Sequence, residues 1–226
     1  MKKILFIVLF INWINIYSQE TKIEAPDYKK IESQITQKTS EFYYSKLVDK
    51  FNAADTTMTL EEKRHLYYGF TFQKKYSPYS RSKHSEALRT LIEKEKLSND
   101  DYEEIIKLSD LILTDNPFDL RTLNYKTHCL KQLNRETELE KVIIKMNMIM
   151  DALMSSGDGI SKETAFYVIY TSNEYDLLNM LGFSFGGEQS LIEHYDYLKL
   201  DENQYKIPGF YFDVSPCLNY LNKDFK

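Results

Sequence analysis

Residues 66–79 read LYYGFTFQKKYSPY, and this stretch decides how the first half of the chain folds. Tyr68, Phe72 and Tyr76 recur every four residues and share one face of a helix, while other apolar residues of the stretch lie on a second face. A helix that is apolar on more than one face packs on more than one side, so we expect a central helix. Gly69 in its middle costs about 1 kcal/mol relative to alanine, which predicts that another backbone approaches closely there.

The limits of this central helix follow from local signals. Thr59 and Glu62 have the spacing of a capping box, which starts the helix at Leu60. The residue before a proline is forced out of the α conformation, so Ser77-Pro78 ends the helical stretch.

Apolar residues at helical spacing predict further helices on both sides of the central one. These cover residues 28–51, 83–96, 98–115, a segment with Asn116 as N-cap and Pro117 in its first position, and 135–153. Short helices joined by tight turns indicate stacked antiparallel hairpins. Residues 98–153 resemble a tetratricopeptide-type repeat, although its characteristic tryptophan and paired alanines are missing.

The pattern changes after the glycine-rich segment 155–159. Short apolar or alternating runs predict strands over residues 165–170, 191–200 and 207–214, with Gly186-Gly187 as a turn or loop. A short helix over residues 173–181 precedes them and ends at Gly182.

The predicted fold class is therefore α+β, mainly α. A helical body over residues 19–154 is followed by a small, mostly antiparallel β-containing cap over residues 155–226, and the two form one continuous domain. Residues 1–18 precede this domain and have a different character.

Residues 1–18 read as a secretory signal peptide. Lys2 and Lys3 precede an almost wholly apolar run, and Ser18 supplies the small residue at the cleavage point. The run is shorter than the ~20 residues of a membrane-spanning helix, although an uncleaved anchor is the alternative. We expect an exported protein, periplasmic or extracellular, with no membrane insertion after cleavage.

The charge and the cysteines limit the possible partners and cofactors. Loss of Lys2 and Lys3 changes the formal charge from −5 to −7, and without a concentrated basic run we expect no nucleic-acid partner.

Cys129 and Cys217 either pair or stay as two separate buried thiols, and the second arrangement is favoured. No cysteine–histidine cluster has zinc-site spacing, so neither a metal nor a cofactor is predicted.

Tyrosines of the central stretch are the candidate ligand-binding residues. Tyr67, Tyr76 and Tyr79 could line a groove for a peptide or a sugar, because tyrosine combines a flat apolar face with a polar tip. The alternative is packing within the core, which we favour for the helical members. Tyr76 and Tyr79 flank Pro78 outside the helix, where side chains are freer to meet a ligand.

His194 and Asp196 are the candidates for acid–base chemistry. On a single strand they would point to the same side, and a carboxylate can orient an imidazole. No nucleophile motif accompanies them, so an ordinary polar strand face is the favoured alternative.

The segment Gly157-Asp158-Gly159 could hold a cation or a phosphate, but it lacks the ligand count and spacing of such loops and favours a plain turn.

Several segments together are similar to a bacterial family known as domain of unknown function 4919. They are Leu66–Phe70, Tyr76-x-Pro78-Tyr79, Ser155-x-Gly157-Asp158-Gly159, Glu163-Thr164-Ala165 and Tyr211–Val214. The resemblance extends from about Tyr28 onward and implies an exported protein. The family has no assigned activity, so the resemblance implies no catalytic residues.

The leading functional prediction is a non-enzymatic module that binds an envelope peptide, protein or glycan. The helical hairpins and the lack of an organised catalytic motif in the sequence favour it. The alternative is a cell-envelope hydrolase that uses acidic residues near His194 and Asp196.

Export gives the first testable prediction. We expect cleavage after Ser18, so that the exported protein starts at Gln19. N-terminal sequencing or the intact mass of exported material checks this, and a mature form that retains Trp13 would contradict it.

Overall fold

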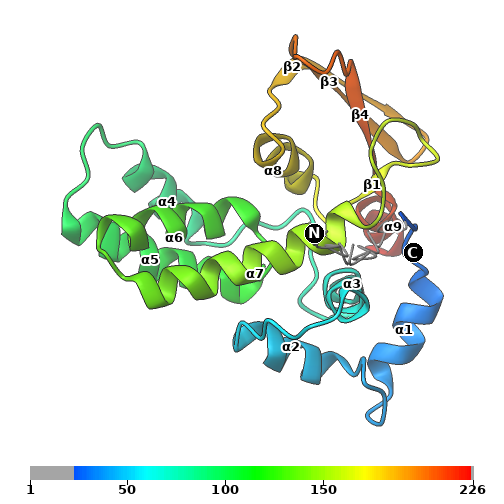
Figure 1. Ribbon diagram of the computed structural model, residues 1–226, viewed down its shortest axis with the longest axis horizontal. Helices are drawn as coiled ribbons and strands as arrows, with labels where there is room; N and C mark the ends of the chain where they lie inside the picture. Colours follow the sequence, from blue (N-terminus) through cyan, green and yellow to red (C-terminus); the bar gives the residue numbers. More distant parts are fainter. Residues whose placement is uncertain (1–22, 225–226) are drawn as a thin grey trace, which may run out of the picture.

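The computed structural model describes residues 23–224, and the predicted signal peptide lies outside them. Figure 1 shows a mainly helical N-terminal part followed by a small sheet, so the chain is α+β, mainly α. The helices of the described part are α1 (Tyr28–Thr36), α2 (Tyr44–Asn52), α3 (Leu60–Gly69), the 3-10 helix η1 (Phe70–Phe72), α4 (Ser85–Ile92), α5 (Asn99–Asp115), α6 (Leu120–Gln132), α7 (Glu136–Met154), α8 (Ser172–Met180) and α9 (Ser215–Asp224). The strands are β1 (Phe166–Tyr167), β2 (Phe185–Ile192), β3 (Tyr195–Leu200) and β4 (Gly209–Asp213).

Helix α3 is the predicted central helix. The capping box forms: the Thr59 hydroxyl accepts from the Glu62 amide at 3.2 Å, and the Glu62 carboxylate accepts from the Thr59 amide at 2.8 Å. Seven of the ten helical residues are buried, and α1, α2 and α7 pack around them. The helix ends at Gly69 and tightens into η1, well before Pro78.

The packing at Gly69 differs from the prediction. A Cβ there would lie 3.2 and 3.3 Å from side-chain carbons of Ile35 and 3.5 Å from the Tyr44 ring. The close neighbours are therefore side chains from α1 and the start of α2, and the expectation of a neighbouring backbone was wrong.

Two predicted helix boundaries were also wrong. Residues 28–51 form α1 and α2 rather than one helix, and the break lets Phe42 stack on the His65 ring of α3 with centroids 4.0 Å apart. Asn116 caps the end of α5, and its side chain accepts from the Phe118 amide at 3.2 Å. The N-cap of α6 is Asp119, which accepts from the Thr122 amide at 3.0 Å.

The sheet has the order β1-β4-β3-β2, in which β1 and β4 are parallel and the other pairs are antiparallel. The predicted strand over residues 191–200 is the end of β2, a two-residue turn at Glu193-His194, and β3. Gly186 and Gly187 lie inside β2, where a turn was expected. A Cβ on Gly186 would lie 2.8 Å from the Leu200 backbone, so glycine permits a close approach of the two strands.

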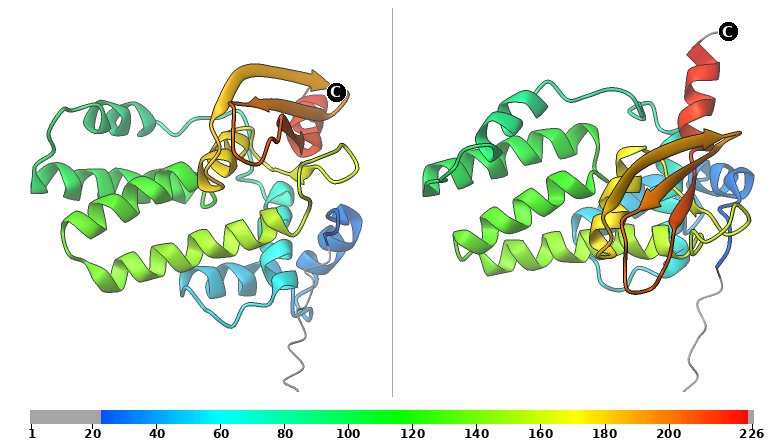
Figure 2. Two further views of the ribbon diagram at one scale, coloured as in Figure 1. Left: turned by 45° about the horizontal axis from the view of Figure 1, so that its top comes forward. Right: turned by 90° about the horizontal axis from the view of Figure 1, so that it is seen from above.

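One face of the sheet packs into the core and the other does not. Except for Asp196, the buried inward residues of β1, β3 and β4 are apolar: Phe166, Leu198, Leu200, Phe210 and Phe212. They join one continuous hydrophobic cluster that also includes α3 and the α5–α7 helices. In both views of Figure 2 the sheet lies well apart from α4 and α5, with α8 between the sheet and the long helices.

Two glycines give a ranked stability prediction. A Cβ on Gly157 would lie 2.2 Å from the carbonyl oxygens of Thr164 and Ala165, whereas at Gly69 it meets the flexible Ile35 side chain. We expect Gly157→Ala to destabilise the fold by about 3 kcal/mol, at the upper end of overpacking effects. Gly69→Ala should stay within about 1 kcal/mol of the wild type, because helix propensity offsets the tight contact. Urea denaturation checks the order, and equal midpoints for the two variants would contradict it.

Candidate functional site

Two of the predicted ligand-binding tyrosines lie in the core. Tyr67 is 1 % exposed and donates to the Asn173 side chain at 2.8 Å, and Tyr76 is 5 % exposed and donates to the Ile169 carbonyl at 2.7 Å. Burial raises the pKa of both hydroxyls. Neither can touch a ligand while the core is closed, so for these two the ligand-contact prediction was wrong and packing was right. Tyr79 is 46 % exposed and stays a candidate.

His194 and Asp196 lie on opposite sides of the sheet. The predicted shared face was wrong because His194 belongs to the turn between β2 and β3. Its Nε2 lies 3.4 Å from Oδ2 of Asp213, which pairs in register with Tyr195 on the outward face. Asp196 points inward and accepts from the Gln189 side chain at 2.9 Å.

The outward side of the sheet carries a group of half-buried tyrosines, which we call the tyrosine face. It consists of Tyr167 on β1, Tyr211 on β4, and Tyr195 and Tyr197 on β3. Tyr197 lies directly opposite Tyr211, and their ring centroids are 4.8 Å apart at an interplanar angle of 48°. The two rings therefore form a continuous aromatic surface across neighbouring strands.

Gly209 makes room for this arrangement. A Cβ at this position would lie 2.4 Å from both Cζ and Oη of Tyr197. The Tyr197 ring therefore crosses the backbone of β4 where a side chain would otherwise stand. Glycine in a strand interior is costly unless something approaches closely, and here the approaching group is the aromatic ring.

Polar and charged groups border the tyrosine face at the turn. The His194 ring packs on Tyr195 with centroids 4.1 Å apart. Lys162 lies 5.6 Å above the same tyrosine ring, and its Nζ is 3.3 Å from a Glu193 carboxylate oxygen. Both signs of charge are present side by side, so this border does not select strongly for a charged ligand.

The tyrosine face offers neutral hydroxyl groups beside apolar rings. Desolvation raises the pKa of Tyr195 and Tyr197, so their hydroxyls stay neutral donors at pH 7. Among the hydrogen bonds of residues 23–224, none joins the His194 ring to a serine, threonine or cysteine side chain. The histidine–carboxylate contact thus lacks the nucleophile that acyl-transfer chemistry requires.

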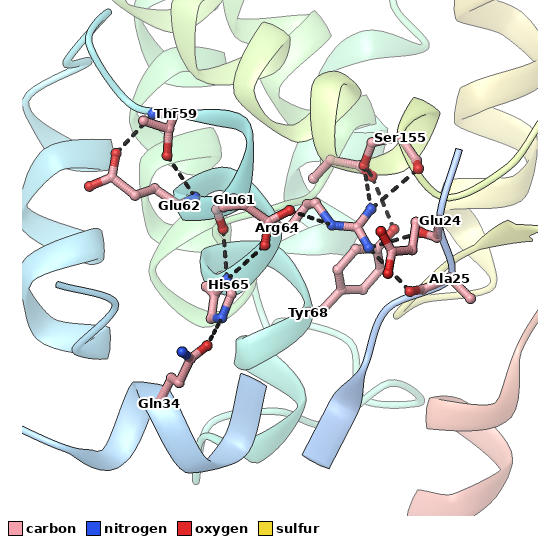
Figure 3. Close-up of polar contacts among 11 residues, drawn as sticks. Glu24, Ala25, Gln34, Thr59, Glu61, Glu62, Arg64, His65, Tyr68 and Ser155 are labelled. Carbon is pink, nitrogen blue, oxygen red and sulfur yellow. Dashed lines mark hydrogen bonds and ion pairs between the residues drawn. The ribbon is translucent and has the colours of Figure 1, made fainter. Parts of the chain in front are cut away.

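The charged residues of α3 have a structural role, which Figure 3 shows. Arg64 donates through Nη1 to the Ser155 hydroxyl at 2.6 Å, and through Nη2 to the carbonyls of Glu24 and Ala25 at 2.8 and 3.3 Å. It also lies 5.7 Å above the Tyr68 ring. Because the guanidinium ties the N-terminal segment to the end of α7, its donors are used within the fold.

His65 is likewise committed to the fold. It is 1 % exposed, with Nδ1 2.7 Å from the Glu61 carbonyl and Nε2 2.7 Å from the Gln34 side chain (Figure 3). Desolvation lowers the pKa of the imidazole, which favours the neutral ring. Both ring nitrogens are occupied, so His65 offers no group to a substrate.

A pair of buried carboxyl groups lies on the inward side of the sheet. Gln189 Nε2 is 2.9 Å from Asp196 Oδ2 and 3.5 Å from Glu174 Oε2, and Tyr175 donates to the Gln189 carbonyl oxygen at 2.5 Å. Among the described residues no ion pair reaches either carboxyl. Burial and then the negative charge of Asp196 raise the pKa of Glu174 to about 9. Glu174 has no exposed surface, so the pair is buried between α8 and the hairpin rather than facing a substrate.

Sequence reasoning missed the residues of the tyrosine face, although part of the signal was visible. Tyr195 and Tyr197 alternate with inward residues, as Tyr211 does in β4. The sequence prediction treated residues 191–200 as one strand, and this hid the alternation of Tyr195 and Tyr197 within β3. The sequence carried no signal for Glu174, because an acidic residue in the first turn of a helix is ordinary.

The remaining predicted elements can also be placed. Cys129 and Cys217 are separate buried thiols. In the loop after α7, the amides of Asp158 and Gly159 both donate to the Thr164 carbonyl, at 3.0 and 2.8 Å, so this segment is a closed turn. Of the helices between residues 23 and 224, none combines the length and apolar character needed to cross a membrane.

A family model matches most of the chain. It is described as Domain of unknown function (DUF4919), and it matches residues 29–223. The chain belongs to this family. The DUF4919 match includes α1 to β4 and most of α9, so both the central helix and the tyrosine face lie within it. No curated protein and no solved structure matches the chain.

The buried carboxyl pair predicts a pH dependence of stability. In the unfolded chain Glu174 ionises near pH 4.3, but in the fold it keeps its proton up to about pH 9. The folded state binds more protons between these values, so the free energy of unfolding should fall as pH rises, by at most about 1.4 kcal/mol per pH unit for one proton. Glu174→Gln removes this contribution to the pH dependence of the free energy of unfolding. Its denaturation midpoint should therefore exceed that of the wild type at pH 8 and vary less with pH.

The matched control is Glu140→Gln, at an exposed position of α7. It should keep the pH dependence of the wild type. A Glu174→Gln profile parallel to that of the wild type would contradict the raised pKa of Glu174.

Proposed function

We propose that this DUF4919 protein is a non-enzymatic binding module that binds a glycan through its tyrosine face. The observation that carries the proposal is the pairing of Tyr197 with Tyr211 on the side of the sheet that does not pack into the core. These half-buried aromatic rings on neighbouring strands lie outside the hydrophobic core and form a partly exposed apolar surface. They are a frequent mark of binding surfaces.

The chemistry of the face favours a glycan among possible partners. A tyrosine ring offers an apolar plane to the C–H face of a sugar, and its hydroxyl can bond to sugar hydroxyls. The nearby charges are balanced in pairs, since Lys162 lies by Glu193 and Lys199 lies by Glu188 at 2.5 Å. This balance suits a neutral ligand with many hydroxyl groups better than an acidic or basic peptide.

The helical part serves as the scaffold in this proposal. Helices α5, α6 and α7 follow each other with short connections and pack in sequence, as in tetratricopeptide-like stacked hairpins. Helix α7 contacts β1 and α6 contacts α8, so these elements connect the helices to a mostly antiparallel cap. The proposal also includes export to the periplasm or the cell exterior, where envelope glycans are present, and this part rests on residues 1–18 of the sequence.

An envelope hydrolase is the less supported alternative. It now depends on the contact between His194 and Asp213, since Asp196 is on the other side of the sheet. That contact could orient an imidazole, but no nucleophile is hydrogen-bonded to it among the described residues.

Substitutions on the tyrosine face test the proposal. Tyr197→Ala and Tyr211→Ala should each weaken glycan binding by about 30-fold, because truncation of an aromatic anchor costs about 2 kcal/mol. A glycan array identifies the ligand, and isothermal titration calorimetry with the identified oligosaccharide then measures the affinity. Tyr197→Phe should lose less glycan affinity than Tyr197→Ala, because it keeps the aromatic ring.

Two other exposed tyrosines provide controls. Tyr205 is 65 % exposed and lies outside the tyrosine face, so Tyr205→Ala should bind as the wild type does. Tyr79→Ala tests the candidate ligand-binding residue from the stretch of residues 66–79. If only this variant loses glycan binding, the binding site lies at Tyr79 and not on the tyrosine face. Failure of the wild type to bind any glycan, with binding to a peptide instead, would overturn the assignment of the partner.

A further inference from the structure

A second surface feature is the open edge of the sheet, which strand β2 forms. In the strand order β1-β4-β3-β2, β2 has a single neighbour, and the ladder with β3 is its one backbone pairing within residues 23–224 (Figure 1). In an antiparallel ladder every second residue directs its amide and carbonyl away from the partner strand. Strand β2 therefore presents unpaired backbone donors and acceptors along its other side.

This edge lacks most of the features by which proteins prevent edge-to-edge association. Those features are short length, lysine, proline and bulges. Strand β2 has eight residues, the last six of which are exposed, and it contains neither lysine nor proline. Its bulge lies between Phe185 and Gln189, which leaves residues 189–192 in a regular ladder with β3. The opposite edge of the sheet, β1, has only two residues. The regular part of β2 is thus the better template for a further strand.

Two large apolar side chains lie on this regular part of the edge. Leu191 is 54 % exposed and Ile192 is 43 % exposed. Leu191 pairs with the inward residue Asp196 and Ile192 pairs with the outward residue Tyr195, so one apolar side chain lies on each side of the sheet. A strand that covers this edge must therefore bring apolar side chains to both sides.

The charge of the edge favours an identical strand. Glu188 is the one charged residue of β2, and its carboxylate lies 2.5 Å from Nζ of Lys199. Because this pair is neutral, two copies of β2 can meet without like-charge repulsion. A charged peptide, in contrast, would find no unpaired charge on the strand that selects it.

We propose that β2 pairs in antiparallel orientation with β2 of a second copy of this chain. A two-fold axis at Leu191 places this residue opposite the partner's Leu191 on the inward side, and Ser190 opposite the partner's Ile192 on the outward side. The four strands of each copy then form one continuous sheet, with both tyrosine faces on the same side. The contacts lie in β2, so the dimer does not depend on the proposed glycan function.

Sedimentation equilibrium of the purified protein tests the association. The apparent mass should rise from that of one chain toward twice that value as the protein concentration is raised to about 1 mM, where even a weak dimer is populated. It should not exceed twice that value, because the pairing closes the one long open edge of each copy.

Lysine substitutions on the edge should prevent the pairing. Leu191→Lys and Ile192→Lys each bring a charge to the contact and should weaken dimerisation at least tenfold. Both side chains are exposed, so the circular dichroism spectrum and the urea midpoint should stay as in the wild type. The matched control is Ile143→Lys on α7, where the side chain is 44 % exposed, and it should dimerise as the wild type does.

A cysteine variant tests the register. In an antiparallel ladder the Cα atoms of opposite residues are about 4.5–5.5 Å apart, which is within the range of a disulfide. Leu191→Cys should therefore give a disulfide-linked dimer under mild oxidation, and Ile143→Cys should not. The native thiols of Cys129 and Cys217 are buried and should not contribute. Equal yields of linked dimer from the two variants would contradict the pairing.

Three further results would overturn the proposal. One is a wild-type protein that stays monomeric up to about 1 mM. Another is equal dimerisation of the wild type and the folded Leu191→Lys variant, because the copies would then associate elsewhere. The third is a monomeric protein that binds an extended peptide and loses this binding in Leu191→Lys, which would assign the edge to a peptide partner.

Discussion

The burial of most of α3 is the constraint on which the rest of the structure depends. The buried part of such a helix must satisfy the polar groups that it carries, since each buried group without a partner costs about 1–3 kcal/mol. Tyr67 and Tyr68 meet this requirement by donating to Asn173 and to the Ala152 carbonyl, and Arg64 donates to Ser155. Each of these partners lies more than eighty residues later in the chain. The polar groups of α3 therefore fix the positions of α7 and α8 relative to it.

Tyrosine has two distinct roles in this molecule. Around α3 the rings fill the core and the hydroxyls reach carbonyl or side-chain oxygens, which makes the aromatic core specific as well as apolar. On the outward face of the sheet, Tyr197 and Tyr211 are half-buried and pack on each other. The same residue type thus fills the core in one place and, in the proposed function, binds a ligand in another.

Helix α8 contrasts with α3 in how its polar groups are treated. Three buried side-chain atoms on α8 have no partner: Asn173 Nδ2, Glu174 Oε1 and Asp176 Oδ2. Folded proteins tolerate such groups where a proton, a ligand or a later conformational step makes use of them. Glu174 lies by Asp196 and has a raised pKa, and Asp176 accepts from Arg121 through Oδ1 alone. Helix α8 lies between the long helices and the sheet, so these groups lie where the two parts meet.

The sequence by itself determined the features that depend on neighbouring residues. The capping box of Thr59 and Glu62, the central helix and the order of helices followed by a sheet were all predicted, because capping and periodicity are local signals. Only the tertiary structure decided which tyrosines are buried, that His194 lies by Asp213, and that Glu174 lies by Asp196. The last two contacts depend on the turn at Glu193-His194, where Glu193 has a φ of 64° without the asparagine or glycine that normally signals such a turn. A two-residue turn without that signal reads as continuous strand, and it reverses the chain so that contacts form between residues far apart in the sequence.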